Sequence, residues 1–193
     1  MANANRNRLI NAIVFFAENT QHCGKIKLFK LLYLLDFENF RQTGKSVTGF
    51  EYQAWKFGPV PFELMEEWEE FGPDMAQAIR IEPEKIYDHT RMSVRVNEGV
   101  AFDPEDFTPR QLRIMEELAT KYRTNYSLPM VELTHEENGA WDKVWHNGAG
   151  AQKVIPYDLA VGDVPERDEV LSVAAERAMY QAALEAARNA ATA

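Results

Sequence analysis

Two local motifs of this sequence contain residue types that could do chemistry, but neither has the spacing that catalysis requires. His135-Glu136 begins like a zinc-protease motif, which needs a second histidine four residues after the first, whereas position 139 is Gly. Cys23 directly follows His22, yet adjacent residues rarely place their side chains for the proton transfer that activates a thiol. We therefore expect no catalytic residue, no metal and no cofactor. His135 is instead expected to form hydrogen bonds near a helix end, and Cys23 to be a half-buried thiol.

Paired carboxylates could act as a general acid and base, and such pairs are abundant here. Examples are Glu66/Glu67, Glu69/Glu70, Glu116/Glu117 and Glu136/Glu137. Most of them fall on the outer faces of predicted helices, where runs of charge are ordinarily solvated. A phosphate-binding loop is not evident either, because Gly148-x-Gly150 is short and no strand plainly precedes it. The sequence thus predicts a protein that is not an enzyme, with a hydrolase built on His135 and its neighbouring glutamates as the enzymatic alternative.

The composition is that of a globular protein with an uneven distribution of charge. The chain has 193 residues, of which 46% are hydrophobic, and its net charge is −9. Residues 1–45 contain seven Lys/Arg and three Asp/Glu, which gives +4 and leaves −13 for the remainder. A protein this acidic is repelled by nucleic acid unless it has a concentrated basic face. The cluster Lys25, Lys27 and Lys30 is the candidate for such a face; we expect it to be a solvated helix edge, with a DNA-binding regulator as the alternative.

The sequence also indicates a compartment. It contains one cysteine, so no intrachain disulfide can form, and residues 2–7 are polar, unlike a signal peptide. The longest apolar cluster, at 28–40, is interrupted by Lys30, Asp36 and Glu38 and is too broken to span a bilayer. We therefore expect a cytoplasmic protein that is not bound to a membrane.

Hydrophobic periodicity predicts a mainly helical protein. Apolar residues recur at helical spacing in the ranges 6–18, 25–42, 61–71 and 108–122, and a short helix is expected from 127. Gly44 marks a helix end, and Thr108, Pro109 and Gln111 form a capping-box start. Alternation predicts short strands at 50–57, 79–81 and 92–96, which could form a small antiparallel sheet. The expected fold class is therefore α+β, mainly α: a helical domain with a small antiparallel β-sheet or hairpin.

The C-terminal part of the sequence differs in composition from the rest. From Asp163 to about Ala190 it is rich in alanine, with high helix propensity but few large residues that could bury area. We expect a domain at 6–162, followed by an Ala-rich helix or mobile tail at 163–193.

Large aromatic residues occur in segments that are expected to be loops. Trp55 and Phe57 flank a Gly-Pro turn, and Trp141 and Trp145 flank a Gly-rich loop. Aromatic residues beside polar groups suit the hot spots of protein–protein interfaces. They could equally pack inward beneath the loops, and the sequence leaves both interpretations open.

Two segments together resemble a known family. The first is Lys27-Leu-Phe-Lys-Leu-Leu-Tyr-Leu-Leu-Asp36, followed by Ala54-Trp-Lys-Phe-Gly-Pro-Val60. The second is Leu133-Thr-His-Glu-Glu137, followed by Ala140-Trp141 and by Lys153-Val-Ile-Pro156. This ordered series resembles the Panacea (SocA-like) antitoxin domain, a family also described as phage-associated proteins, over about residues 6–162.

The resemblance implies a mainly helical domain with a small sheet that acts as the antitoxin of a toxin–antitoxin pair. Its partner would be a cognate toxin protein, bound directly, and the Ala-rich end would suit presentation of the toxin to an ATP-dependent protease. The motif positions carried over to this chain are Trp55, Lys56, Phe57, Gly58, Pro59, Thr134, His135, Glu136 and Trp141. Whether they contact the toxin or hold the fold is left open, with Gly58 and Pro59 expected to be structural.

Overall fold

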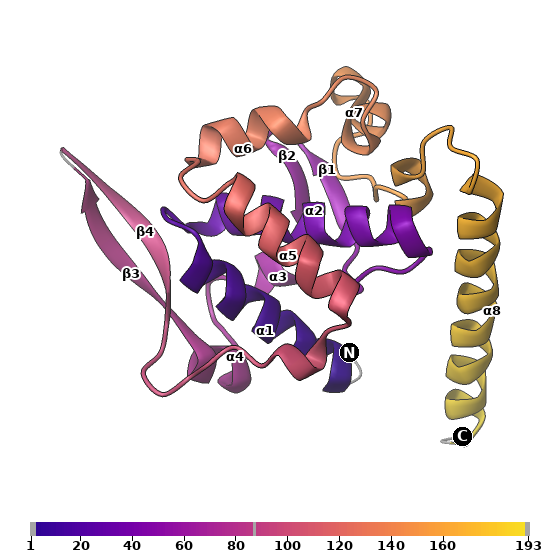
Figure 1. Cartoon of the computed structure of the whole chain (residues 1–193), viewed down its shortest axis with the longest axis horizontal. Helices are drawn as coiled ribbons and strands as arrows, with labels where there is room; N and C mark the ends of the chain where they lie inside the picture. Colours follow the sequence, from indigo (N-terminus) through magenta and orange to yellow (C-terminus); the bar gives the residue numbers. More distant parts are fainter. Residues whose placement is uncertain (1–2, 87, 192–193) are drawn as a thin grey trace.

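The computed structural model describes residues 3–86 and 88–191, and it confirms the mainly helical α+β fold that the sequence predicts. Helix α2 (Lys25–Thr43) lies at the centre, with α1 (Asn3–Asn19) and α5 (Pro109–Lys121) packed against it (Figure 1). The shorter helices are α3 (Phe62–Glu67), α4 (Pro73–Ala78), α6 (Ser127–Thr134) and α7 (Ala140–Trp145). Short 3-10 helices lie at Pro104–Asp106, His146–Gly148 and Tyr157–Ala160.

Helix α2 is buried on several sides because its apolar residues cover most of its circumference. Leu28, Leu31, Leu32 and Leu35 are all fully buried, as expected for a helix whose apolar surface is this wide. The helix ends where the sequence predicts. Gly44 adopts a φ of 67°, and its N–H donates to the carbonyl oxygen of Phe40 at 2.8 Å.

Two separate hairpins contain the strands. Strand β1 (Tyr52–Trp55) pairs antiparallel with β2 (Gly58–Pro61), and β3 (Ile79–Ile86) pairs antiparallel with β4 (His89–Val96). The sequence predicts one strand over 50–57 and a helix from about residue 61. Instead the chain reverses at positions 56–57 and returns as β2, so the helix is shorter. Within the described strands, the two hairpins remain separate and do not join into one sheet.

A buried carboxylate fixes the loop that follows α2. Asp36 is fully buried and accepts hydrogen bonds from the backbone N–H groups of Val47 and Thr48, each at 2.7 Å. It also accepts from the hydroxyl of Tyr52 at 2.7 Å and from the side chain of Thr48. Burial raises the pKa of Asp36, and the hydrogen bonds oppose this rise. These contacts hold β1 against α2.

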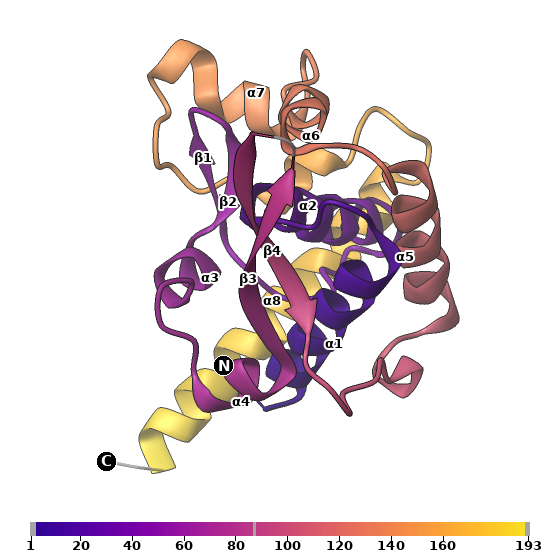
Figure 2. The same ribbon diagram turned by 90° about the vertical axis from the view of Figure 1, so that its left-hand side faces the viewer.

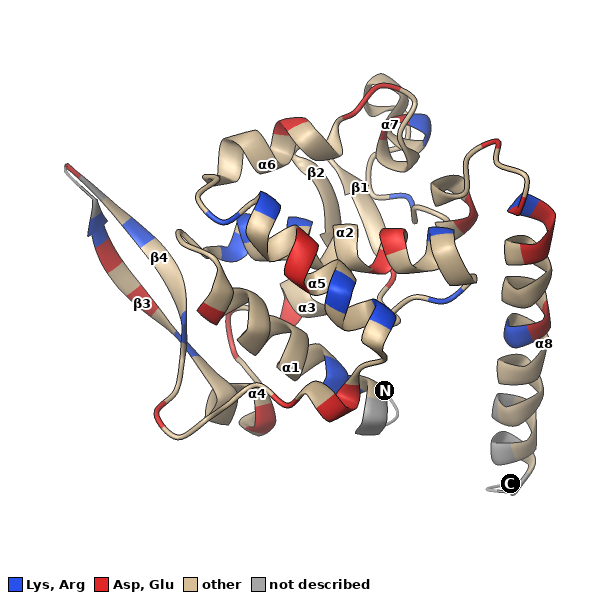
Figure 3. Ribbon diagram, viewed as in Figure 1, with Lys and Arg blue, Asp and Glu red and all other residues tan. Residues whose placement is uncertain are grey.

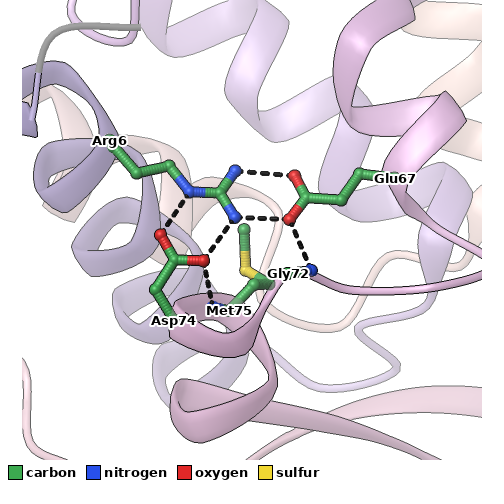
Figure 4. A network of polar contacts seen from close by, with 5 residues as sticks. All are labelled: Arg6, Glu67, Gly72, Asp74 and Met75. Carbon is green, nitrogen blue, oxygen red and sulfur yellow. Dashed lines mark hydrogen bonds and ion pairs between the residues drawn. The ribbon is translucent and has the colours of Figure 1, made fainter.

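Arg6 connects α1 to the last residue of α3, Glu67, and to Asp74 in the first turn of α4 (Figure 4). Its guanidinium donates to both oxygens of Asp74 at 2.8 Å and to Glu67 at 2.6 Å. The backbone N–H groups of Gly72 and Met75 complete the network by donating to the same carboxylates, at 3.0 and 2.8 Å. Hydrogen bonds from Arg6 lower the pKa of Asp74 to about 2. The network therefore carries charge-assisted hydrogen bonds, which are stronger than neutral ones.

Helix α8 (Arg167–Ala191) includes most of the predicted Ala-rich segment and runs beside the body of the protein (Figure 1). Its first turns pack on the C-terminal end of α2, where Val170 contacts Phe40 and Val161. Farther along, Met179 and Tyr180 are 75% and 63% exposed. The β3–β4 hairpin projects on the other side, with acidic and basic residues interspersed along it (Figure 3). Within the described residues, we find no helix whose length and apolarity would allow it to cross a membrane.

Candidate functional site

The two motif segments meet in the folded protein, although about 80 residues separate them in the chain. The indole N–H of Trp141, in α7, donates to the backbone oxygen of Trp55, in β1, at 3.0 Å. The ring of His135 stacks on Trp141 with a centroid distance of 3.8 Å, and Trp141 in turn stacks on Trp145. Figure 2 shows α7 beside the β1–β2 hairpin, as this contact requires. One site therefore contains both motifs.

Lys30 lies in the interior of this site. Its side chain is almost fully buried, and its Nζ donates to the carbonyl oxygen of Pro59 at 2.8 Å. Burial lowers the pKa of Lys30 to about 7, and no carboxylate among the described residues contributes to this shift. A buried ammonium without a counter-charge is energetically costly. Lys30 is thus the most perturbed basic group of the site.

Lys27 is also buried, one turn earlier on α2. Its Nζ donates to the backbone oxygens of Gln21, Arg123 and Asn125, at 2.7, 3.0 and 2.9 Å. Burial lowers the pKa of Lys27 to about 8. The side chain therefore joins the segment that follows α1 to the segment that follows α5.

These two lysines correct the prediction of a solvated basic edge. Lys27 and Lys30 point into the protein, so neither can contact a phosphate backbone. Only Lys25 of the cluster reaches the surface, where its Nζ lies 3.6 Å from the carboxylate of Glu69. The structure thus gives no support to a DNA-binding regulator that uses this cluster.

Gly58 and Thr134 enclose Lys30 from two sides. Gly58 has a φ of 93°, and a Cβ at this position would lie 2.7 Å from both Lys30 Nζ and Thr134 Oγ1. The hydroxyl of Thr134 donates to the backbone oxygen of Val131 at 3.0 Å, within α6. Pro59 is buried and supplies the carbonyl that accepts from Lys30. Position 58 therefore requires glycine, both because its φ is positive and because no side chain fits there.

His135 lies directly after α6, at the predicted helix end. Its backbone N–H donates to the carbonyl oxygens of Val131 and Glu132, each at 3.1 Å. The expected side-chain hydrogen bonds are less complete, because the buried Nε2 has no protein partner among the described residues. Burial and the positive charge of Lys30 lower the pKa of His135, which favours the neutral ring. Glu136, the next motif residue, is exposed.

The residues that could act as a nucleophile or metal ligand are poorly placed for either role. Cys23 is 2% exposed, so it is more deeply buried than the sequence indicates. Burial raises the pKa of its thiol to about 11, which disfavours the thiolate. The neighbouring His22 stacks on Tyr126 instead, at 4.2 Å, and lies 3.0 Å from Arg91. Among the described residues there is no cluster of three or more His, Cys, Asp or Glu side chains that could hold a metal ion.

An apolar groove opens on the outer side of the site. It has a volume of about 360 Å³, and α2, β1, β2 and α3 supply its lining: Lys25, Ile26, Phe29, Lys30, Trp55, Lys56, Phe57, Val60 and Met65. Phe57 is 63% exposed and Ile26 is 43% exposed. The Nζ of Lys56 lies 5.7 Å from the centre of the Phe57 ring. We call this feature the Phe57 groove.

The sequence identified only part of this groove. Trp55, Lys56 and Phe57 were candidates because of the motif, and the structure places them in the groove. Ile26, Phe29, Val60 and Met65 were missed as site residues. Their apolar character fits helix and strand patterns equally well, so no local signal separated them from the core.

Comparison with known proteins gives one family. The family described as "Antitoxin SocA-like, Panacea domain" matches residues 28–142, which is 115 of 193 residues and more than half of the chain. The matched part includes Leu28–Asp36, Ala54–Val60 and Leu133–Trp141 of the motif segments, whereas Lys27, Lys153–Pro156 and α8 lie outside it. No curated protein and no solved structure matches the chain.

Proposed function

Because this chain belongs to the family of SocA-like antitoxins with a Panacea domain, we propose that it neutralises a cognate toxin protein by binding it directly. Membership in the family supports a role in a toxin–antitoxin pair in general. The observation that carries the proposal is the match over residues 28–142, because this part includes most of both motif segments and most of the Phe57 groove.

The contacts within the site support binding rather than catalysis. Lys30 and Trp141 donate hydrogen bonds that join α2 and α7 to the β1–β2 hairpin, and Thr134 donates within α6. A catalytic nucleophile would need a base within hydrogen-bond reach, and Cys23 and His22 do not form such a pair. We propose that the protein is not an enzyme and acts as a stoichiometric partner of the toxin.

Delivery of the bound toxin to an ATP-dependent protease is a second part of the proposal. Helix α8 lies outside the matched family region, and its later residues Met179, Tyr180 and Leu184 are exposed. A helix that buries little of its surface opens at low energetic cost, which suits recognition by an unfolding protease. Removal of residues 176–193 should then prolong the lifetime of the antitoxin and its toxin in cells without preventing complex formation.

Growth assays with the adjacent gene test the main proposal. The protein encoded by the neighbouring open reading frame is expressed alone and then together with this chain. We expect growth arrest in the first case and normal growth in the second, with a complex of the two proteins in pull-down experiments. A neighbour that is not toxic, or rescue without a complex, would contradict direct neutralisation.

The dose of antitoxin distinguishes a binder from an enzyme. A stoichiometric binder rescues growth only when its amount reaches that of the toxin, whereas an enzyme rescues at a small fraction of that amount. We expect a threshold near equal amounts when both proteins are quantified in the same cells. Full rescue at one tenth of the toxin level would refute the non-enzymatic mechanism.

A further inference from the structure

We propose that the Phe57 groove binds a segment of the toxin in which a large apolar side chain stands next to a carboxylate. The apolar side chain enters the groove, and the carboxylate faces its lysines. This inference rests on the proposed function, because a surface that binds the toxin exists only if the protein is an antitoxin that acts by direct binding.

An aromatic residue is exposed on a rigid turn beside the groove. Phe57 lies at the reversal between β1 and β2, and Gly58 permits this reversal with its φ of 93°. The hairpin is fixed on both strands, by Trp141 bonding to Trp55 and by Lys30 bonding to Pro59. An exposed aromatic on a fixed backbone loses little conformational freedom on binding, which is typical of interface hot spots.

The side chains that line the groove carry positive charge. Three lysines line the groove, and its described lining contains no aspartate or glutamate. The ion pair of Lys25 with Glu69 is long, at 3.6 Å, and the Glu69 side chain is 88% exposed, so it neutralises little of the charge. The groove is therefore a basic spot on a protein whose net charge is −9. Charge complementarity favours a carboxylate in the partner.

Lys30 adds a buried positive charge beneath the groove. This lysine contributes to the groove lining, and its ammonium is buried with one carbonyl oxygen as its hydrogen-bond partner among the described residues. Because Lys30 points into the protein, a carboxylate of the partner would pair with the exposed ammonium of Lys56 beside Phe57, and the buried charge of Lys30 adds to the positive potential there. A phosphate group fits less well, because a mainly apolar groove would remove its strongly bound water without replacing its hydrogen bonds.

Binding measurements with matched variants test the proposal. The probe is the toxin encoded by the adjacent open reading frame, carrying a substitution that abolishes its toxicity so that it can be purified. Phe57→Ala should weaken binding at least tenfold, since a central aromatic anchor is lost. Tyr180→Ala is the control, because Tyr180 is also 63% exposed but lies on α8; its effect should stay within twofold.

Charge reversal tests the carboxylate. Lys56→Glu should weaken binding at least fivefold at low salt, and the loss should shrink as the salt concentration rises. Lys45→Glu makes the same change of charge at an exposed position at the other end of α2 and should leave binding within twofold. Both groove variants should unfold at the same denaturant concentration as the wild type, because Lys56 and Phe57 are exposed.

A photo-crosslinker at position 57 of the full chain identifies the occupant directly. We expect crosslinks to a toxin segment that contains a large apolar residue next to Asp or Glu. Crosslinks to a basic segment, to a second copy of this chain or to nucleic acid would overturn the proposal. So would groove variants that bind the toxin as tightly as the wild type, and that outcome would leave the antitoxin function intact. If wild-type protein neither binds nor neutralises the toxin, both proposals fail.

Discussion

Replacing Lys30 with methionine should remove a large pH dependence from the stability of this protein. Methionine keeps the length and apolar character of the side chain but carries no charge. In the wild type, the buried ammonium lacks a counter-charge and burial lowers its pKa from 10.5 to about 7. The variant loses one hydrogen bond to Pro59 and gains relief from the desolvated charge. We therefore expect Lys30→Met to be more stable than the wild type at pH 7.

The size of the effect follows from the two pKa values. Between pH 7 and pH 9 the unfolded chain keeps its proton on Lys30, whereas the folded protein changes from about half protonated to nearly neutral. The unfolded state thus binds more protons in this window, so the free energy of unfolding of the wild type rises with pH. A difference of one bound proton over two pH units corresponds to about 2.7 kcal/mol. Because the folded protein still keeps about half a proton on Lys30 at pH 7, the expected change is about 2 kcal/mol. The advantage of Lys30→Met should shrink by that amount at pH 9.

Urea unfolding at pH 7, 8 and 9, followed by circular dichroism, measures this difference. Lys27, whose pKa burial lowers to about 8, contributes to the slope in the same direction in both proteins and cancels in the comparison. Lys25→Met removes a partly exposed lysine and is the control for loss of a positive charge. Parallel stability curves for the wild type and Lys30→Met would show that Lys30 is charged equally in both states, and the reasoning would be wrong.

Three further predictions concern Gly58, the Arg6 network and α8. Gly58→Ala should lower the free energy of unfolding by at least about 2 kcal/mol more than Gly99→Ala does, which is on the order of a buried steric clash. Both residues have positive φ, but of the two only Gly58 would bring its Cβ within 2.7 Å of other atoms. Equal losses in urea unfolding would contradict this. Arg6→Ala should lower the free energy of unfolding by about 2 kcal/mol, because the carboxylates of Glu67 and Asp74 lose their hydrogen bonds to Arg6. Arg41→Ala removes an exposed ion pair with Glu38 and should lower it by less than about 0.5 kcal/mol. The wild-type advantage over Arg6→Ala should fall as the pH drops toward about 2, because the pKa of Asp74 is lowered and its stabilising charge is lost on protonation. Removal of residues 176–193 should change the unfolding free energy by less than about 1 kcal/mol, because the exposed side chains there bury little area; a larger loss in thermal unfolding would show that α8 supports the body.

The local features of the fold could be predicted because each depends on residues close together in the chain. The capping box forms as expected, with the side chain of Thr108 accepting from the N–H of Gln111 and the side chain of Gln111 accepting from the N–H of Thr108. Gly44 ends α2 in the left-handed conformation. Both patterns satisfy backbone groups that a helix end leaves unpaired. Their physical cause is therefore contained in four or five consecutive residues.

The β2 strand was missed because its local signals point away from a strand. Gly58-Pro59-Val60-Pro61 contains two prolines, which cannot donate a hydrogen bond to a neighbouring strand. The segment nevertheless pairs with β1, and Lys30 in α2 binds the carbonyl of Pro59. The pairing itself is local, between residues 52 and 61, whereas the hydrogen bond from Lys30 spans 29 residues and no short window of sequence contains it.

Some features of the site likewise follow from the sequence, and others only from the tertiary structure. The sequence by itself determined which residue types form the two motifs, that the protein is mainly helical, and to which family it belongs. Only the tertiary structure decided that Trp55 and Trp141 touch, that Lys27 and Lys30 point inward, and that Phe57 remains exposed. Charge and hydropathy are properties of a residue type, whereas burial depends on which distant segments pack around it. A lysine that binds carbonyl groups of residues 21, 123 and 125 therefore has the same sequence signal as one in water.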